Sequence, residues 1–408
     1  PTADGCNGDT FTMTVTVYPS PVLTANAAAA TICSGQNAVI NLSSSIAGTR
    51  YTWTTTTVSG VTGNTSNSTP NATTNITQLL NNNNNVASTV NYTITPVLSN
   101  GCSGTPVNVA IIVDPKPTEA NAGPNENICN STSYTLKGNN PVVGTGKWTE
   151  VTTIGGITFD DDTKYNAVVS GLQAGKTYTF KWTITGAATC TPSSSNVSIT
   201  VSPLSIGGTT AGATTVCAGT NTGTVTLSGQ VGNVIRWESS TNGTTWNNIT
   251  STANTISYLN LNATTRYRAL VQSGVCASAY STETIITVNQ RVTVANAGSD
   301  QNLCNVTSTT LAGNLPTVGT GTWTLTSTQT GVSFADANLF NTVVNGLLPG
   351  QTYTFKWTID GQSPCPPTSD EVNIKVDLLS EGGTTAGATT VCAGTNTGTV
   401  TLSGQVGN

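Results

Sequence analysis

Short runs of alternating apolar and polar residues follow one another along most of the chain. Between residues 116 and 203 these runs are SYTLKG, GKWTEV, NAVVSGL, TYTFKWTI and NVSITV. A period of two turns one apolar face toward a core and one polar face toward solvent, which predicts half-buried β-strands. Gly, Asn, Pro and Ser cluster between the runs and favour turns. Strands that recur about every 8–12 residues are typical of a β-sandwich, and no segment keeps a helical period beyond a single turn.

The chain repeats itself at a fixed offset. Residues 204–233 recur at 379–408 with one change, Ile206 to Glu381, and the offset is 175. YTFKWTI at 178–184 returns at 353–359 with the same offset. A period of 175 residues is too long for one sandwich and fits two of about 88 residues each.

Proline-marked strand ends set the expected boundaries, and the junctions are too short to be flexible linkers. We expect an all-β tandem array of immunoglobulin-like or fibronectin-III-like sandwiches, arranged in a linear rod. The expected divisions are the last strand of a preceding repeat at 1–19, sandwiches at 20–115, 116–203, 204–290 and 291–378, and the first strands of a following repeat at 379–408.

Aromatic residues recur at positions that predict the core. One tryptophan falls on the third expected strand of each repeat, where sandwiches of this type pack a core indole; these are Trp53, Trp148, Trp237 and Trp323. A leucine and a tyrosine six residues apart resemble a tyrosine corner, in which the hydroxyl bonds back to the preceding turn; the tyrosines are Tyr178, Tyr267 and Tyr353. The asparagine run 81–85 stretches this interval before Tyr92, so the corner is doubtful in the first repeat.

The composition excludes most chemistry. The chain has no histidine, 13 Lys+Arg and 18 Asp+Glu, so charged residues make up 8% against about 25% in ordinary proteins. Histidine-based catalysis and histidine-ligated zinc are excluded, and scattered cations offer no path for a phosphate backbone. We therefore predict no catalytic residues, no cofactor, no metal ligands and no nucleic-acid partner. We expect no membrane insertion of this segment and no export leader within it. The acidic run 160–162 allows calcium as an alternative, but a solvated turn is favoured.

The ten cysteines fall into two sets. The first set precedes the second expected strand and comprises Cys33, Cys129, Cys217, Cys304 and Cys392. The second set follows the penultimate strand and comprises Cys6, Cys102, Cys190, Cys276 and Cys365. Without CxxC pairs, this regular placement favours disulfides over metal binding and predicts an oxidising, extracytoplasmic location.

Two pairing schemes remain open. Pairs within a repeat, such as Cys129–Cys190, would have to bridge the two ends of a sandwich. A seven-residue strand spans about 23 Å, whereas a disulfide joins Cα atoms roughly 6 Å apart. The favoured scheme therefore joins neighbouring repeats, as Cys33–Cys190, Cys129–Cys276 and Cys217–Cys365. It leaves Cys6, Cys102, Cys304 and Cys392 for partners outside the chain or unpaired.

The motif TTVCAGT…VTLSG…RWESSTNGTTW…TTRYRALVQSGVC resembles the immunoglobulin-like repeats of giant surface adhesins from Bacteroidota. ANAG…NLC…TLAGN…GTGTW…LLPGQTYTFKWTI is similar to the PKD-like repeats that alternate with them. On this resemblance 116–203 and 291–378 are PKD-like, 204–290 is immunoglobulin-like, and 20–115 is one or the other. The gliding-motility adhesins exported by type IX secretion are the group it indicates. The resemblance implies an extracellular filament at the cell surface, anchored at the outer membrane through another region, and it carries over no ligand residues.

Two functions fit these observations. The first is a rigid stalk of an adhesin that contacts a substratum or surface polysaccharide through other parts of the full-length protein. The second is a carbohydrate-binding repeat array attached to an exported enzyme. The second needs exposed aromatic side chains, and Trp246 in NGTTWNN is the one tryptophan expected in a loop. An enzyme is not expected.

We predict that the chain scatters X-rays as a rod, with about 40 Å of length per repeat from strand length plus loops. Small-angle scattering in solution checks this. Side-by-side packing of the repeats, seen as a compact profile, would contradict it.

Overall fold

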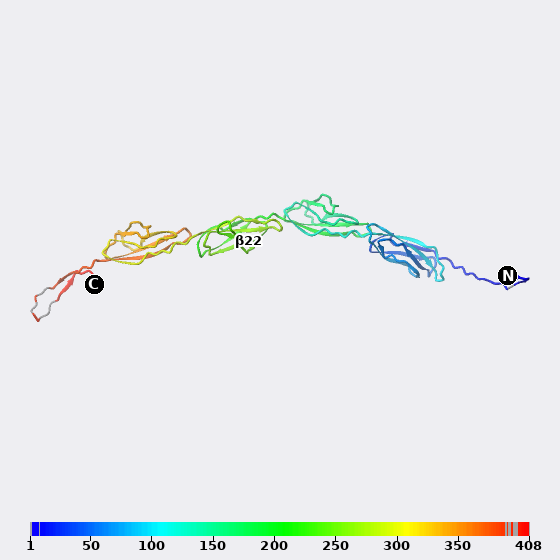
Figure 1. Cartoon of the computed structure of the whole chain (residues 1–408), viewed down its shortest axis with the longest axis horizontal. Coiled ribbons are helices and arrows are strands. Elements are labelled where there is room, and N and C mark those ends of the chain that lie inside the picture. The colour runs from blue at the N-terminus through cyan, green and yellow to red at the C-terminus, as the bar shows by residue number, and fades with distance from the viewer. Residues whose placement is uncertain (1, 8, 388–389, 391–392, 395–398, 408) are drawn as a thin grey trace. The chain divides into compact units, whose positions relative to one another are not determined.

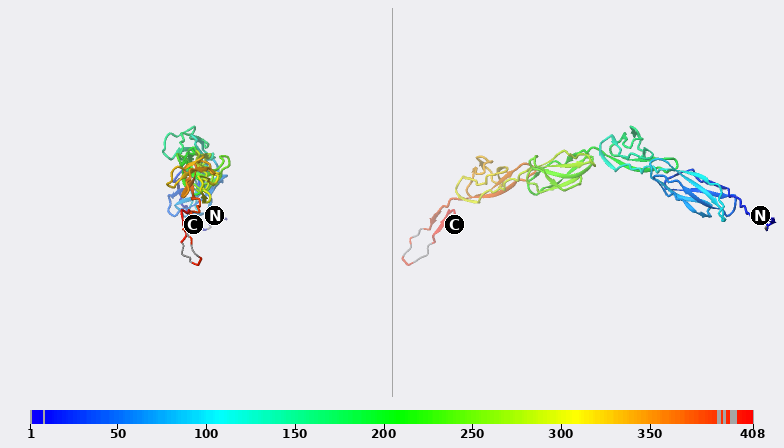
Figure 2. Two further views of the ribbon diagram at one scale, coloured as in Figure 1. Left: turned by 90° about the vertical axis from the view of Figure 1, so that its left-hand side faces the viewer. Right: turned by 45° about the vertical axis from the view of Figure 1, so that its right-hand side comes forward.

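The structure is a computed structural model that describes residues 2–7, 9–387, 390, 393–394 and 399–407, with the backbone alone at residues 2, 3, 6 and 7. Its regular elements are all β-strands, and none of these residues lies in a helix (Figures 1 and 2). In this part of the chain no helix has the length and apolar character that a membrane crossing takes. The all-β prediction is confirmed.

The chain divides into two compact units. The first is Pro1–Leu204 with Gly274–Cys276, and the second is Ser205–Ser273 with Ala277–Asn408. The expected boundaries at 115–116 and 290–291 lie inside these units, each between two separate pairs of sheets.

In the first unit, the repeat 20–115 consists of two sheets (dark to light blue in Figure 1). One has the order β3 (Leu23–Ala27), β5 (Gln36–Ser44), β9 (Asn75–Asn82), β7 (Val61–Thr62). The other has the order β4 (Thr31–Cys33), β11 (Val107–Asp114), β10 (Ser88–Val97), β6 (Arg50–Thr55), β8 (Asn67–Asn71). Neighbouring strands pair antiparallel except β4 and β11, which are parallel.

The repeat 116–203 has a smaller version of this plan. Its larger sheet has the order β12 (Glu126–Cys129), β18 (Ser193–Ser202), β17 (Thr177–Thr185), β14 (Thr145–Glu150). The facing sheet has the order β13 (Ser133–Thr135), β16 (Val168–Ser170), β15 (Thr158–Phe159). β12 and β18 are the parallel pair.

In the second unit, the repeat 204–290 has one sheet in the order β19 (Thr209–Ala211), β21 (Thr222–Ser228), β24 (Thr255–Leu259). Its other sheet has the order β20 (Thr214–Cys217), β27 (Thr284–Asn289), β25 (Thr265–Gln272), β22 (Asn233–Ser240), β23 (Asn247–Ile249), and β26 (Ala279–Tyr280) also pairs with β25. β22 is labelled in Figure 1.

The repeat 291–378 has the topology of 116–203. Its sheets have the orders β28 (Gln301–Cys304), β34 (Thr368–Asp377), β33 (Gln351–Asp360), β30 (Thr320–Leu325) and β29 (Ser308–Thr310), β32 (Val343–Asn345), β31 (Ser333–Phe334). The repeated YTFKWTI segment therefore forms the penultimate strand in both repeats.

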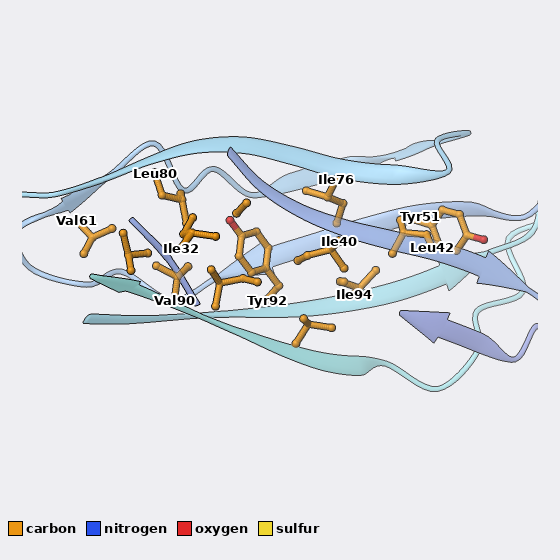
Figure 3. Packing of buried hydrophobic residues seen from close by; sticks show 14 of the residues in the cluster. Ile32, Ile40, Leu42, Tyr51, Val61, Ile76, Leu80, Val90, Tyr92 and Ile94 are labelled. Atoms are coloured by element: carbon orange, nitrogen blue, oxygen red, sulfur yellow. The ribbon is translucent and has the colours of Figure 1, made fainter. Parts of the chain in front are cut away.

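Alternate residues of the facing strands fill the core of the first repeat. Tyr92 and Ile94 of β10 meet Ile40 of β5 and Ile76 of β9, all at 0–2% exposure (Figure 3). The Tyr92 hydroxyl donates to Gln78 Oε1 at 2.8 Å, and burial raises the pKa of this tyrosine to about 12. Tyr92 therefore bonds across the sandwich to β9, and a tyrosine corner does not form there.

Two indoles pack together in the cores of 116–203 and 291–378. Trp148 and Trp182 have ring centroids 4.9 Å apart, and Trp323 and Trp357 have centroids 5.0 Å apart. All four rings are at most 1% exposed. Gly146 lies two residues before Trp148 because a Cβ there would overlap the indole of Trp182. The GTGKW and GTGTW motifs thus provide both the ring and the space for its partner.

Tyrosine corners close two repeats. The backbone N–H of Gln173 donates to the Tyr178 hydroxyl at 3.0 Å, and that of Leu348 donates to the Tyr353 hydroxyl at 2.8 Å. In the repeat 204–290, Tyr267 is buried and stacks on Tyr258 with centroids 6.4 Å apart. Trp237 in the same repeat is fully buried and donates from Nε1 to Ala253 O at 2.9 Å.

Trp53 departs from the expectation of a buried core ring. It is half-buried on β6 and donates from Nε1 to Thr65 O at 2.9 Å. The core volume near the middle of this repeat is taken by Tyr92 and isoleucines, so the indole lies at the edge of the core. The expectation was wrong because it assumed one core position for the tryptophan in every repeat.

The two ends of the chain carry fewer strands than the repeats. Residues 9–19, where a last strand is predicted, form no strand, and Phe11, Met13, Val15 and Val17 are exposed. A strand needs a neighbour for its backbone hydrogen bonds, and no described segment pairs with these residues. A short hairpin of β1 (Thr2–Ala3) and β2 (Cys6–Asn7) precedes them, and a hairpin of β35 (Thr384–Ala386) and β36 (Thr401–Ser403) lies in 379–408.

Replacing Trp323 by Ala should lower the free energy of unfolding of its repeat by about 3–5 kcal/mol, because the cavity cannot close around Trp357. Hydrogen exchange of the whole chain, resolved by repeat, measures the loss. Trp148→Ala is the matched control and should produce the same loss in 116–203. A loss spread evenly over all repeats would contradict local stability.

Candidate functional site: the joints between repeats

A fixed register places the first set of cysteines. In each repeat a short strand that ends in a cysteine pairs in parallel with the last strand. The cysteine lies opposite the final residue of that last strand; the pairs are Cys33 with Asp114, Cys129 with Ser202, Cys217 with Asn289 and Cys304 with Asp377. Each first-set cysteine therefore lies at the end of the sandwich where the chain leaves it, which we call the exit end.

The second set lies at the opposite end. Cys190 is in the loop between β17 and β18, Cys276 between β25 and β27, and Cys365 between β33 and β34. Since the last strand runs toward the exit end, the loop before it lies at the end where the chain enters, the entry end. Each of these sandwiches thus has a first-set cysteine at its exit end and a second-set cysteine at its entry end.

Three disulfides join these positions. They are Cys33–Cys190, Cys129–Cys276 and Cys217–Cys365, with Cα separations of 5.1, 4.9 and 5.0 Å. These are the three pairs expected between consecutive repeats, and none of the six cysteines bonds within its own repeat. Cys102 is half-buried and free, and Cys304 is exposed and free. Cys392 and the side chain of Cys6 lie outside the described residues.

Polar contacts surround the disulfide of the first joint, which we define as residues 33–36, 114–119 and 189–193. The Thr189 hydroxyl donates to Asp114 Oδ2 at 2.6 Å, and Cys190 Sγ lies 3.4 Å from the carbonyl oxygen of Pro115. The Lys116 side chain extends over Gly35, two residues after Cys33. The chain is therefore held on both sides of the bond as it leaves the repeat.

The joint that contains Cys217–Cys365, which we define as residues 217–220, 289–294 and 363–368, repeats this arrangement. Asn289 Nδ2 donates to Ser363 O at 2.8 Å. Arg291 donates from Nε to Ala218 O and from Nη2 to Thr220 Oγ1, both at 2.8 Å. Arg291 corresponds to Lys116 at the offset of 175 and extends over Gly219, which has φ +96°.

The sequence reasoning missed these two cations. Their signal is present, since Lys116 and Arg291 each lie two residues after the last strand of a repeat, in a chain with only 13 Lys+Arg. A cation at a repeated position in so uncharged a chain indicates a specific partner. Here the partner is the turn after the first-set cysteine.

The acidic run 160–162 forms a turn. Asp161 Oδ1 accepts from the backbone N–H and the hydroxyl of Thr163, and these bonds lower the pKa of Asp161. Lys164 lies 3.8 Å from Asp161, and Lys147 lies 3.3 Å from Asp162. Lysines thus balance the run, and the described residues contain no group of three or more potential metal ligands among His, Cys, Asp and Glu.

A buried carboxylate anchors one face of the repeat 204–290. Glu238 is 3% exposed and lies opposite Arg268 in the β22–β25 pair. Its oxygens accept from Arg268 Nη2 at 2.8 Å and Arg236 Nη2 at 2.7 Å. Burial alone would raise the pKa of Glu238, but the hydrogen bonds from Arg268 and Arg236 outweigh it and hold that pKa below its usual value.

This cluster also determines the surroundings of Trp246. The Arg268 guanidinium carbon lies 3.8 Å from the centroid of the Trp246 ring and 3.9 Å from that of Tyr280. The arginine is therefore stacked between two aromatic rings, an arrangement that cation–π attraction favours. One face of the loop-placed indole is occupied by the protein's own side chain, and the ring is half-buried.

Glu238→Gln should lower the free energy of unfolding of the repeat 204–290 by about 1.5–3 kcal/mol near neutral pH, because two arginines lose a charged acceptor. Since the folded-state pKa is depressed, this stabilisation is present above the ordinary glutamate pKa of about 4.3 and is lost as pH falls through the folded value. Hydrogen exchange or denaturant titration, at neutral pH and in acid, should show that the free energies of unfolding of wild type and variant converge in acid. The exposed pair Arg266–Glu283 provides the control, and Glu283→Gln should have little effect. A difference that persists unchanged in acid would contradict this role.

Comparisons with known proteins agree with a repeat array. A family model described as a PKD-like domain matches residues 30–117, and one described as a domain of unknown function (DUF8696) matches residues 206–290. The second match falls within the expected repeat 204–290, and the first covers most of the expected repeat 20–115 and extends two residues beyond it. No curated protein matches the chain significantly.

Solved structures similar to the chain include multidomain immunoglobulin arrays and a PKD domain. Titin domains I67–I69, in an E-to-A variant, are 11% identical over 64% of this chain and 98% of that chain, with a TM-score of 0.43. Immunoglobulin domains 1–4 of Sidekick-1 are 9% identical over 87% and 99%, with a TM-score of 0.30. The PKD domain from the KIAA 1837 protein is 30% identical over 22% and 91%, with a TM-score of 0.20. With its own paired sheets and the PKD-like match, the chain is an array of immunoglobulin-like and PKD-like repeats.

Proposed function

We propose that this chain is a stalk segment of a large secreted cell-surface adhesin. The observation that carries the proposal is the joint. A disulfide and a polar side chain join the exit end of one repeat to the entry loop of the next. A cation after the last strand lies over the turn that follows the first-set cysteine, and the same arrangement occurs twice. Interdomain interfaces of modest size normally leave neighbouring domains free to bend relative to each other, and a covalent bond beside the backbone removes this freedom. Stiffness of this kind serves distance and load rather than catalysis.

Three disulfides also favour an oxidising environment outside the cytoplasm. We propose the cell surface as the location and gliding motility, with export by type IX secretion, as the specific setting. Other parts of the full-length protein would contact the substratum or surface polysaccharide and the outer-membrane machinery. We also propose that the repeats 116–203 and 291–378 are PKD-like.

An in-frame deletion of residues 116–290 in the full-length protein tests the stalk. The deletion removes one period of 175 residues, so Cys33 meets Cys365 in the place of Cys190. We expect normal surface display, retained attachment and a filament shorter by about 80 Å in electron micrographs. Loss of attachment by a normally displayed protein would place the ligand site in this segment and overturn the proposal.

Glycan-array binding of the 408-residue chain distinguishes the stalk from the carbohydrate-binding alternative. A stalk should give no specific binding. Specific binding that Trp246→Ala abolishes, and that Trp53→Ala leaves unchanged, would favour the alternative.

A further inference from the structure

Each disulfide closes a very long loop. The bonded cysteines are 157, 147 and 148 residues apart. Two of the loops follow one another along the chain, because Cys190 is followed by Cys217 after 27 residues. A pull applied outside Cys33 and Cys365 can therefore pass through the first disulfide, residues 190–217 and the second disulfide. It need not pass through the rest of either loop.

We propose that Cys33–Cys190 and Cys217–Cys365 act in series as a covalent tether that prevents the chain from lengthening when its repeats unfold. The proposal deepens the proposed function of a load-bearing stalk. It assigns a role to the connectivity of the bonds rather than to their presence alone. A stalk with disulfides closed inside each repeat would lack this limit at the joints.

The lengths show how strong the limit is. The 27 residues between Cys190 and Cys217 span at most about 90–100 Å when fully extended. The 332 residues of backbone between Cys33 and Cys365 would span about 1,100–1,200 Å. The tether contains the ten-residue strand β18 and the short strands β19 and β20, whose backbone is already extended. Unfolding every repeat between these cysteines would therefore add little length.

The third disulfide, Cys129–Cys276, has a different place in this network. Cys129 lies within the loop 33–190, and Cys276 lies within the loop 217–365. While the two series bonds hold, the third is off the shortest covalent path. If Cys33–Cys190 opens, the shortest path runs 96 residues to Cys129 and then 59 residues back from Cys276 to Cys217, or 155 in place of 27. The third bond then limits the lengthening.

This arrangement separates the tether from ordinary stabilisation. A disulfide stabilises a protein mainly by restricting the unfolded chain, and the effect depends on loop length. The three loops are nearly equal, at 157, 147 and 148 residues, so by that effect the three bonds are equivalent. The tether proposal predicts that removing different bonds lengthens the stretched chain by different amounts.

The test stretches single molecules of the full chain between peptide-tag handles at its two ends, in concentrated guanidinium so that every repeat is unfolded. All variants carry Cys6→Ser, Cys102→Ser, Cys304→Ser and Cys392→Ser to prevent exchange, and non-reducing peptide mapping establishes the three bonds beforehand. Reduction should lengthen the chain by 157 plus 148, or 305 residues, which is roughly 1,000–1,100 Å.

Two variants with one bond removed form the matched comparison. The pair Cys129→Ser and Cys276→Ser should have the same oxidised length as the parent. The pair Cys33→Ser and Cys190→Ser should be longer by 155 minus 27, or 128 residues, about 450 Å. Equal lengths before and after reduction, equal lengthening of the two variants, or mapping that finds Cys129 bonded to Cys190 would each overturn the proposal. Since the measurement involves no ligand or cell, failure of the tether and failure of the adhesin assignment are distinguishable.

Discussion

The parallel pairing of a short first strand with the last strand is the constraint on which the rest of the structure depends. Because the cysteine of the short strand lies opposite the final residue of the last strand, it reaches the exit end in all four repeats. The antiparallel order of the last two strands places the other cysteine at the entry end. Neither position depends on the chemistry of cysteine. The joints follow from strand register, and the sulfur bonds then fix what the register has brought together.

Much of this arrangement could be predicted from the sequence, where the signal is periodic. The alternation of apolar residues predicts the strands, and the leucine–tyrosine spacing predicts the corners that Tyr178 and Tyr353 form. Trp53 could not be placed, because its burial depends on which neighbours fill the core of that repeat rather than on its own strand. The contacts of Lys116 and Arg291 were also missed, since they depend on turns that come together only after folding.

The duplicated segment shows the same limit in one pair of residues. Val225 on β21 is fully buried, whereas its copy Val400 is 70% exposed. The local sequence is the same, but β21 pairs with both β19 and β24 and packs against Trp237, while β36 pairs with β35. A strand's apolar face becomes a core only when the remaining strands of the sandwich cover it. Local pattern predicts which face will be buried, and the rest of the repeat determines whether it is.

The long separation between bonded cysteines has a consequence for how the molecule matures. During synthesis or passage across a membrane, residues emerge from the amino end, so Cys33 meets Cys102 and Cys129 long before Cys190 exists outside. Early oxidation would trap these wrong partners. A repeat that folds first keeps Cys33 and Cys102 at opposite ends of its sandwich, out of reach of each other. Folding of each repeat before oxidation would therefore keep its two thiols apart until the next repeat arrives.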